Sequence, residues 1–415
     1  MIFGVLLRIQ GLISRPLWLD EALQADISRA GTLAEVLSRS AELDLHPPGF
    51  ALCAWLSTQL LGPAEWALRM PSLIAGGLTI PLAWAAGRAW GGREVAATFA
   101  LAAAVCPPWV AYAREARPYA GAIAWVIALI WAAGVHRKSP SILTTTALVI
   151  CAAGALCWQY TAGVIAVGIL GGLAITRRGD RGAILAIIAS LSVGLGLFYA
   201  ILRHQLADRA DVAGHLDLSL LTGPFELIGY CAMGSWRWNA IVGLVLLPLV
   251  LRRIPRDVAW IALLPVGLLY ALALVGLHPF GGIRQCLVLT PALLLAGAHH
   301  RFGLERFLPL GLIGAVVVQI ARFPGVPVWN VPALAAQLEP EIAGHPVWVD
   351  PRLGRSWAHY GQGIPAQIAT WSSSDIPSEP TLWIITVDGS AMPDDGRPAK
   401  QLTAEGVTAT LWIVD

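Results

Sequence analysis

Apolar stretches of nearly membrane-spanning length recur along most of this chain, and short polar loops separate them. A helix needs about 20 apolar residues to cross a membrane. Hydrophobic residues make up 56% of the sequence and charged residues 13%, whereas soluble domains have about 25% charged residues. This pattern excludes an ordinary soluble domain, a disordered chain and a nucleic-acid-binding protein with a basic face. It predicts an all-α polytopic membrane protein.

Ten apolar stretches, together with residues 1–13, predict about eleven transmembrane helices. The ten are 70–89, 95–112, 119–135, 141–158, 161–176, 183–202, 239–251, 258–277, 285–298 and 307–321. Residues 1–13 contain Arg8 and are short for a span, so either the N-terminus is clipped or Arg8 snorkels from a tilted helix. We expect a first helix with a clipped N-terminus. Residues 14–67 are predicted to lie outside the hydrocarbon. Their apolar part, 49–61, is interpreted as an interfacial or re-entrant helix.

Basic residues are concentrated in five short loops between these stretches. The loops contain Arg88 and Arg93; Arg137 and Lys138; Arg177, Arg178 and Arg181; Arg252, Arg253 and Arg256; and Arg301 and Arg306. The positive-inside rule places these loops in the cytoplasm. The N-terminus is then cytoplasmic. The remaining loops and the tail from residue 322 face outward.

The composition changes at residue 322, where prolines and polar residues replace the apolar stretches. We therefore divide the chain into a transmembrane domain, 1–321, and an extracytoplasmic domain, 322–415. Parts of the tail mix β-branched and aromatic residues between turn signals, which is typical of strands. The predicted strands are 346–350, 381–388 and 408–415, and the predicted helices are 333–343 and 352–361. The tail is thus expected to be a small α/β domain.

The six cysteines occur singly, mostly inside apolar stretches, and none forms a CxxC pattern. We interpret them as small core or lipid-facing residues. The sequence has no clear metal-binding motif, and a divalent metal ion is left open as a cofactor.

Two adjacent carboxylates, Asp20 and Glu21, follow the first apolar stretch on the predicted outer face. Carboxylates in the first turn of a helix cap its N-terminus and interact favourably with its dipole. Alternatively, one of the two is a general base or a metal ligand. Spacing alone favours the capping role.

His46 lies between Asp44 and a double proline, in the segment HPPGF. Two prolines before an apolar stretch make the chain rigid and remove two backbone donors, so His46 is held where a helix begins. A single histidine beside a membrane is more often structural than catalytic. The pentad is therefore a more specific signal than the histidine.

Several arginines lie on the predicted outer face, where the positive-inside rule predicts few basic residues. Arg114 and Arg117 flank Glu115 at the outer end of a predicted helix, and Arg284 and Arg69 stand at the outer ends of two others. Pairing with Glu115 is the structural explanation. A phosphate clamp is the functional one, because arginine binds phosphate oxygens bidentately.

Six segments then occur in a characteristic order. They are WLDEA (18–22), HPPGF (46–50), ALRMPSLIAGGLTIPL (67–82), GRAWGGREVA (87–96), YAREARPYA (112–120) and GGIRQCLVLTPALLLAGA (281–298). Together they resemble membrane glycosyltransferases of the GT-C fold, which include the protein O-mannosyltransferases and the lipid A aminoarabinose transferases. The resemblance covers roughly residues 5–300, and the combination of motifs is more specific than any one of them.

The resemblance implies a polyprenyl-phosphate-linked sugar as donor and a site on the outer face. It makes Asp20 the catalytic base, with the adjacent Glu21 as the other candidate. Among the arginines, Arg114, Arg117 and Arg284 would meet the donor phosphate. The full set of implied substrate-binding residues is His46, Arg69, Arg114, Arg117, Tyr119 and Arg284.

We therefore predict an inverting glycosyltransferase that acts in the lipid bilayer, with no nucleic-acid partner. It would transfer a sugar to a hydroxyl of a cell-envelope acceptor, which is a lipid, a polysaccharide or a protein. The alternative is a lipid or polysaccharide transporter, but ionisable residues of a transporter lie near the bilayer midplane. Here they cluster at helix ends, which favours the enzyme. A non-catalytic scaffold is a third interpretation, and the intact motifs argue against it.

Overall fold

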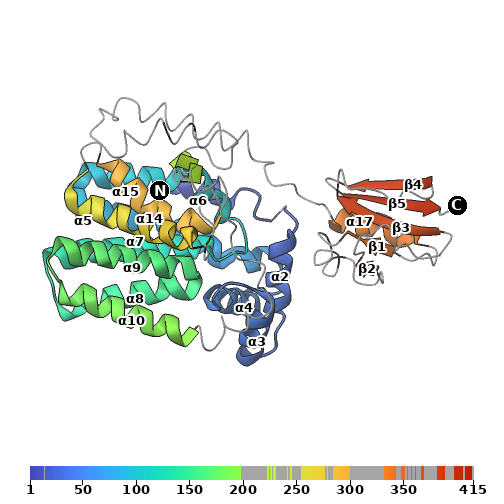
Figure 1. Cartoon of the computed structure of the whole chain (residues 1–415). Coiled ribbons are helices and arrows are strands. Elements are labelled where there is room, and N and C mark those ends of the chain that lie inside the picture. The colour runs from blue at the N-terminus through green and yellow to red at the C-terminus, as the bar shows by residue number, and fades with distance from the viewer. Residues whose placement is uncertain are drawn as a thin grey trace. The chain divides into compact units, whose positions relative to one another are not determined.

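The computed structural model of this protein is mostly helical and has a small sheet near the C-terminus (Figure 1). It describes residues 1–13, 15–197, 254–275, 284–299, 331–342, 347–350, 366–368, 381–387, 397–404 and 407–413, with isolated positions at 222–223, 225–226, 228–229, 241, 244, 278, 353, 357 and 360. The predicted helices 239–251 and 307–321 lie almost entirely outside the described residues.

The chain divides into two compact units. The first comprises residues 1–12 and 30–321, and the second comprises residues 13–29 and 322–415. Residues 13–29, which the sequence analysis placed with the helical domain, therefore group with the C-terminal domain.

The first unit is a bundle of helices (Figure 1). Its described helices are α1 (Ile2–Ile9), α3 (Leu33–Leu43), α4 (Gly49–Leu61), α5 (Glu65–Val105), α6 (Pro107–Tyr112), α7 (Tyr119–Lys138), α8 (Ile142–Trp158), α9 (Tyr160–Thr176), α10 (Arg181–Leu197), α14 (Arg256–Leu274), the 3₁₀ helix η3 (Arg284–Leu289) and α15 (Thr290–Ala298). Among the described residues, α5, α7 and α14 are long and apolar enough to cross a membrane, and five shorter apolar segments accompany them.

Helix α5 covers most of two stretches that the sequence analysis treated as separate helices. The helical backbone is interrupted within it at Gly92, whose φ of 88° lies in the left-handed region. Glycine adopts this region without the steric cost that a Cβ imposes, so the change of direction falls where the sequence predicted a loop. The second stretch ends early, because α6 starts afresh with prolines in its first turn, where a missing N–H costs little.

Helix α7 lies at the centre of the hydrophobic core, with Ile123, Ile127 and Ile130 fully buried. Small residues elsewhere allow close packing of the surrounding helices. A Cβ added to Gly168 of α9 would lie 2.6 Å from the Cα of Pro265 in α14, which is closer than two carbon atoms can pack. The α9–α14 contact therefore requires glycine at this position.

The second unit contains α2 (Leu19–Ser28), α17 (Val331–Leu338), the 3₁₀ helix η5 (Glu339–Glu341) and a five-stranded sheet. The strands are β1 (Val347–Val349), β2 (Ala366–Ile368), β3 (Thr381–Val387), β4 (Arg397–Ala404) and β5 (Val407–Ile413), in the spatial order β2-β1-β3-β5-β4. β1 pairs in parallel with β2 and β3, whereas β5 pairs antiparallel with β3 and β4. Leu334 and Leu338 of α17 pack against the sheet in a core that includes Trp383.

The predicted strands correspond to β1, β3 and β5, and the small C-terminal sheet is confirmed. Strands β2 and β4 were missed. β2 has only three residues, and β4 carries Arg397, Pro398, Lys400 and Gln401, so neither shows the alternation of a half-buried strand. The predicted helix 333–343 corresponds to α17 and η5, and most of the predicted helix 352–361 lies outside the described residues.

Candidate functional site

Asp44 and His46 form a compact pair between α3 and α4. Helix α3 ends at Leu43, and Asp44 has extended backbone dihedrals. Its Oδ1 lies 2.8 Å from the His46 Nδ1 and also accepts a hydrogen bond of 2.8 Å from the Leu45 N–H. The two prolines that follow leave little backbone freedom, so the chain presents both side chains in one arrangement.

Gly49 of the segment HPPGF lies where a larger residue would not fit. Helix α4 begins at Gly49. A Cβ at Gly49 would lie 3.0 Å from the carbonyl carbon of Cys157, near the end of α8. Since a Cβ would force these helix ends apart, the segment HPPGF sets both the rigidity and the close packing of the junction.

Arg117 reaches the same pair from the turn that precedes α7. Its Nη1 lies 3.8 Å from the Asp44 Oδ2, and its Nη2 lies 3.2 Å from the His46 Nδ1. The turn is fixed to α5 by Ser72, whose hydroxyl donates to the Arg117 carbonyl oxygen at 2.9 Å. Asp44 and Arg117 are both buried. We call Asp44, His46 and Arg117 the outer cluster.

The geometry assigns the proton on His46. Asp44 accepts hydrogen bonds, and the guanidinium of Arg117 only donates them. The shorter contact, to Asp44, is satisfied when Nδ1 carries a proton, and Arg117 then interacts with Asp44 mainly through charge. In the described part of the chain, the Nε2 atom makes no hydrogen bond.

Aromatic rings hold the imidazole in place. The Tyr119 ring meets the His46 ring edge-on, with centroids 5.7 Å apart and planes at 90°. Tyr112 packs against Tyr119 at 4.8 Å. Edge-to-face contacts of this kind are favourable, and Tyr119 is fully buried. Tyr119 therefore orients His46 rather than lying on the surface.

The charges of the cluster keep Asp44 ionised. Burial acts to raise the pKa of Asp44, but the neighbouring His46 ring, its hydrogen bond and the Arg117 guanidinium outweigh burial and hold that pKa well below its ordinary value. The cluster thus pairs a buried carboxylate with a guanidinium and an imidazole.

We expect Asp44 to stabilise the fold in a pH-dependent way. Its folded pKa is depressed, so its contribution is present above the unfolded pKa of about 3.9 and is lost as the pH falls through the lower folded value. Asp44→Asn should lower the free energy of unfolding by roughly 1–3 kcal/mol near pH 7. The loss should become smaller as the pH drops below about 4. Thermal melts of both proteins across this range measure the effect, and an equal difference at every pH would contradict it.

Arg114, between α6 and α7, and Arg69 of α5 both bind backbone carbonyls. Arg114 donates from Nε to the Leu7 carbonyl oxygen at 2.9 Å and also from Nη2. Arg69 donates to the Leu12 carbonyl oxygen at 2.9 Å. Both side chains are buried. The structure therefore gives each a role in holding the N-terminal segment, and their predicted contact with a phosphate stays a prediction.

The alternative interpretation, in which Arg8 snorkels to the interface, does not hold. Arg8 is 0% exposed, and its guanidinium donates to the carbonyl oxygens of Ala103 at 2.6 Å and Ala104 at 3.0 Å. These carbonyls belong to the last turn of α5, where carbonyl oxygens have no N–H donor within the helix. The helix dipole also favours a cation at this end. A nearby helix end thus satisfies the charge inside the protein.

Arg284 opens η3, where it is half-buried. Polar residues that the sequence analysis did not single out surround the α8–α9 junction. Gln159 donates to the Gln285 carbonyl oxygen at 3.3 Å, and the Thr161 hydroxyl lies 2.8 Å from the His278 Nε2. In the sequence, Gln159 and Thr161 are marked only by the break between the apolar stretches 141–158 and 161–176.

Asp20 and Glu21 lie in the first turn of α2 and belong to the second unit. Glu21 is buried, and its Oε2 accepts a hydrogen bond of 3.4 Å from the Trp18 N–H. This contact is the helix-capping role that the sequence left open. Asp20 is partly exposed, and its predicted catalytic role stays a prediction.

An apolar pocket of about 640 Å³ lies between α4, α5, α7 and α8. Leu56, Ile74, Leu78, Ala124 and Trp158 are among the residues that line it. Met70 and Pro71 also line the pocket and directly precede Ser72, which holds Arg117. The pocket therefore extends along α5 and α7 from the level of the outer cluster.

In the described part of the chain, no group of three or more His, Cys, Asp and Glu side chains is placed to hold a metal ion.

Comparison with known proteins finds a family match over part of the chain. Residues 45–204, which include His46, Arg69, Arg114, Arg117 and Tyr119, match the family described as dolichyl-phosphate-mannose-protein mannosyltransferase. A search of curated proteins found no significant match.

Two crystal structures of ArnT from Cupriavidus metallidurans share the fold over nearly the full length of both chains. The structure bound to undecaprenyl phosphate has a TM-score of 0.61 at 14% identity, and the apo structure has a TM-score of 0.54 at 16% identity. Each alignment covers 99% of this chain and 97% of ArnT. The predicted resemblance is thus confirmed at the level of the fold: this chain has the GT-C fold of ArnT, and residues 45–204 carry the match to the dolichyl-phosphate-mannose-protein mannosyltransferase family.

Proposed function

We propose that this protein is a membrane glycosyltransferase that takes a sugar from a polyprenyl-phosphate donor. The mannosyltransferase match and the fold shared with an undecaprenyl-phosphate-bound transferase support this class. The observation that carries the proposal is the position of the outer cluster beside the apolar pocket of about 640 Å³. A polyprenyl-phosphate has one charged group attached to a long apolar chain. This site places a cation, Arg117, next to the apolar pocket.

In this proposal the phosphate of the donor meets Arg117 and His46. The Arg117 guanidinium, from the motif YAREARPYA, contacts His46, and it suits a phosphate because its planar fork binds two oxygens. The His46 Nε2 supplies a second donor when the ring is protonated. Asp44 holds both groups in position through its short contact with His46 and its charge interaction with Arg117.

The prenyl chain of the donor would lie in the pocket between α5 and α7. Gly121, one turn after Arg117, lines this pocket, so a lipid with its phosphate at Arg117 can place its first isoprene units there. The lining is almost entirely apolar, which is the surface that a prenyl chain would bury.

The transfer step is assigned to Asp20 by the family resemblance. The Asp20 carboxylate would remove the proton of an acceptor hydroxyl. The acceptor oxygen then bonds to the anomeric carbon, and the bond from that carbon to the phosphate oxygen breaks, so that the prenyl phosphate leaves with the electron pair. Attack opposite the leaving group inverts the anomeric centre. Arginine charge at the phosphate stabilises the leaving group.

The pocket predicts a matched pair of variants. Ile74 lines the pocket and is 56% exposed, whereas Ile150 of α8 is 54% exposed and does not line it. Ile74→Trp should weaken binding of undecaprenyl phosphate about tenfold, because overfilling a packed site costs about 1–3 kcal/mol. Ile150→Trp should leave it unchanged. Binding is measured on purified protein in nanodiscs, and equal affinities for the two variants would remove the pocket from the proposal.

An assay of sugar transfer distinguishes an enzyme from a transporter. Purified protein supplied with a polyprenyl-phosphate sugar and a hydroxyl acceptor should release the prenyl phosphate and form a glycosidic bond. A transporter would bind and move the lipid but leave that bond intact, so intact donor after prolonged incubation with a panel of envelope acceptors would count against the enzyme.

We further propose the full membrane arrangement, with about eleven spans, a cytoplasmic N-terminus and an extracytoplasmic domain at 322–415 in a bacterial inner membrane. The support is the alternation of basic and non-basic loops. A phosphatase reporter fused after residue 415 should be active outside the membrane, and the same reporter inserted at residue 179 should be inactive. A cytoplasmic tail would overturn this orientation.

A further inference from the structure

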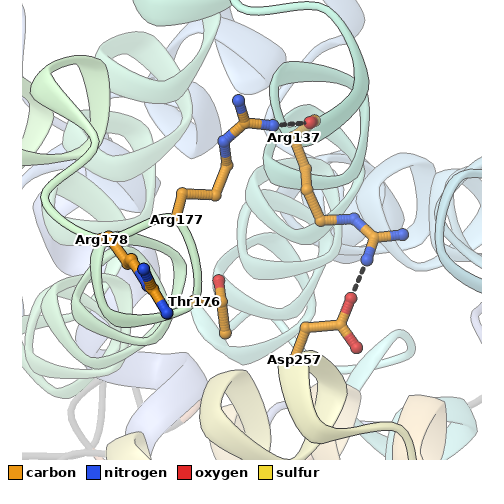
Figure 2. Close-up of a pocket in the computed structure, with 5 residues that line it drawn as sticks. All are labelled: Arg137, Thr176, Arg177, Arg178 and Asp257. Carbon is orange, nitrogen blue, oxygen red and sulfur yellow. Dashed lines mark hydrogen bonds and ion pairs between the residues drawn. The ribbon is translucent and has the colours of Figure 1, made fainter.

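A second pocket lies at the other end of α7 from the outer cluster. It has a volume of about 460 Å³ and is lined by Arg137, Thr176, Arg177, Arg178 and Asp257 (Figure 2). Arg137 is in the last turn of α7, Arg177 and Arg178 follow α9, and Asp257 is in the first turn of α14. Twenty helical residues separate this pocket from the turn that holds Arg117, a length of about 30 Å.

The backbone fixes Arg178 in an unusual conformation. Helix α9 ends in a Schellman motif, in which the Gly179 N–H bonds to the Ala174 carbonyl oxygen at 2.8 Å. The left-handed residue of such a motif is usually glycine, but here it is Arg178, with φ of 47°. A side chain in this region is held against a steric cost, and strain of this kind is found where a side chain has a function.

The charges of the other lining residues are already paired. The Arg137 guanidinium forms an ion pair with Asp257 and lies 4.7 Å from the centre of the Trp90 ring. Arg177 donates to the Arg137 carbonyl oxygen, and its Nε lies 3.4 Å from the Asp180 Oδ2. Asp180 in turn contacts the His136 Nε2 at 3.0 Å. Figure 2 shows these two arginines turned toward their partners.

The Arg178 side chain forms no hydrogen bond or ion pair within the described part of the chain. The residues that line the pocket carry three guanidinium groups and one carboxylate, that of Asp257, while Asp180 pairs with Arg177 from outside the lining. The lining therefore has positive charge in excess. Three arginines from two helix ends around one space form the kind of site that binds phosphate oxygens.

We infer that this pocket, lined by Arg137, Arg177 and Arg178, binds a phosphate-bearing anion. The volume exceeds the size of a bare phosphate ion and accommodates the headgroup of an anionic phospholipid, whose negative charge complements the positive excess of the lining. A bound anion would connect the ends of α7, α9 and α14 and would thereby stabilise the bundle by mass action. This inference does not depend on the proposed glycosyl transfer.

The test compares two asparagine variants of the full chain. Arg178→Asn reduces the excess charge at a position where asparagine tolerates the left-handed region. Arg93→Asn removes an exposed arginine from another predicted cytoplasmic loop that does not line the pocket. Delipidated protein in neutral detergent is titrated with inorganic phosphate, with short-chain phosphatidylglycerol and with short-chain phosphatidylcholine. The thermal midpoint is followed, and bound lipid is counted by native mass spectrometry.

Wild type and Arg93→Asn should be stabilised by phosphatidylglycerol or by inorganic phosphate, and Arg178→Asn should bind the same probe about tenfold more weakly. Stabilisation by phosphatidylglycerol alone identifies a lipid headgroup, whereas stabilisation by inorganic phosphate identifies a soluble phosphate. Arg178→Gly, which relieves the backbone cost, should be at least as stable as wild type without ligand and should also lose the response. Equal responses in wild type and both Arg178 variants would overturn the inference.

Discussion

Replacing Asp20 with asparagine should lower glycosyl transfer about 10²–10⁴-fold while the donor still binds. The substitution keeps the shape of the side chain and removes the proton acceptor, and general-base catalysis typically contributes a factor of this size. Asp20 is partly exposed in the first turn of α2, so the change should not disturb packing. Turnover by purified protein and binding of undecaprenyl phosphate measure the two effects separately.

Two controls distinguish catalysis from helix capping. Glu21→Gln changes the side chain that accepts from the Trp18 N–H, and its main effect should be a loss of stability of about 1 kcal/mol. Asp26→Asn alters an exposed carboxylate on the same helix, where it pairs with Arg29, and should change neither property. Near-normal turnover in Asp20→Asn would remove Asp20 from the mechanism.

Replacing Arg117 with alanine should weaken binding of the donor by about 10- to 100-fold, because a charge-assisted contact to phosphate contributes roughly 1.5–3 kcal/mol. Arg117→Lys should restore only part of the affinity, since the bidentate fork is lost. Arg284→Ala is expected to act in the same direction. Affinity for undecaprenyl phosphate in nanodiscs is the measurement, and Arg39→Ala, which removes an exposed arginine of α3, is the matched control.

Arg117 is also a partner of the buried Asp44, so Arg117→Ala leaves a carboxylate without its guanidinium and could lower stability. The double variant Asp44→Asn/Arg117→Gln removes both charges together. If the phosphate contact is the cause, the double variant folds and still binds the donor weakly. Normal affinity in a folded double variant would show that Arg117 acts only on the structure.

Residues 381–388 could be predicted as a strand because alternation and turn signals are local properties, and the same holds for the break near Gly92. The pairing of Asp44 with Arg117 could not be predicted, since it depends on how the α3–α4 junction packs against the turn between α6 and α7. Arg114 and Arg117 look equivalent in the sequence, yet the turn between α6 and α7 directs one to the Leu7 carbonyl and the other to the cluster.

The contacts of Arg8 could not be predicted for the same reason. Its acceptors are carbonyls in the last turn of α5, about which the sequence around Arg8 contains no information. A charged residue in an apolar segment therefore indicates that a partner is needed, but its own neighbourhood does not show where that partner lies.

This contact also constrains the order in which the bundle is assembled during synthesis. Arg8 binds the carbonyl oxygen of Ala104, which is 96 residues further along the chain. At a ribosomal rate of about 5–20 residues per second, roughly 5–20 s pass between the synthesis of Arg8 and that of its acceptor residues. An eight-residue helix is marginal by itself, so α1 should be protected from hydrogen exchange only in nascent chains long enough to contain α5. Helix α1 would then be among the last of the N-terminal helices to take its final place.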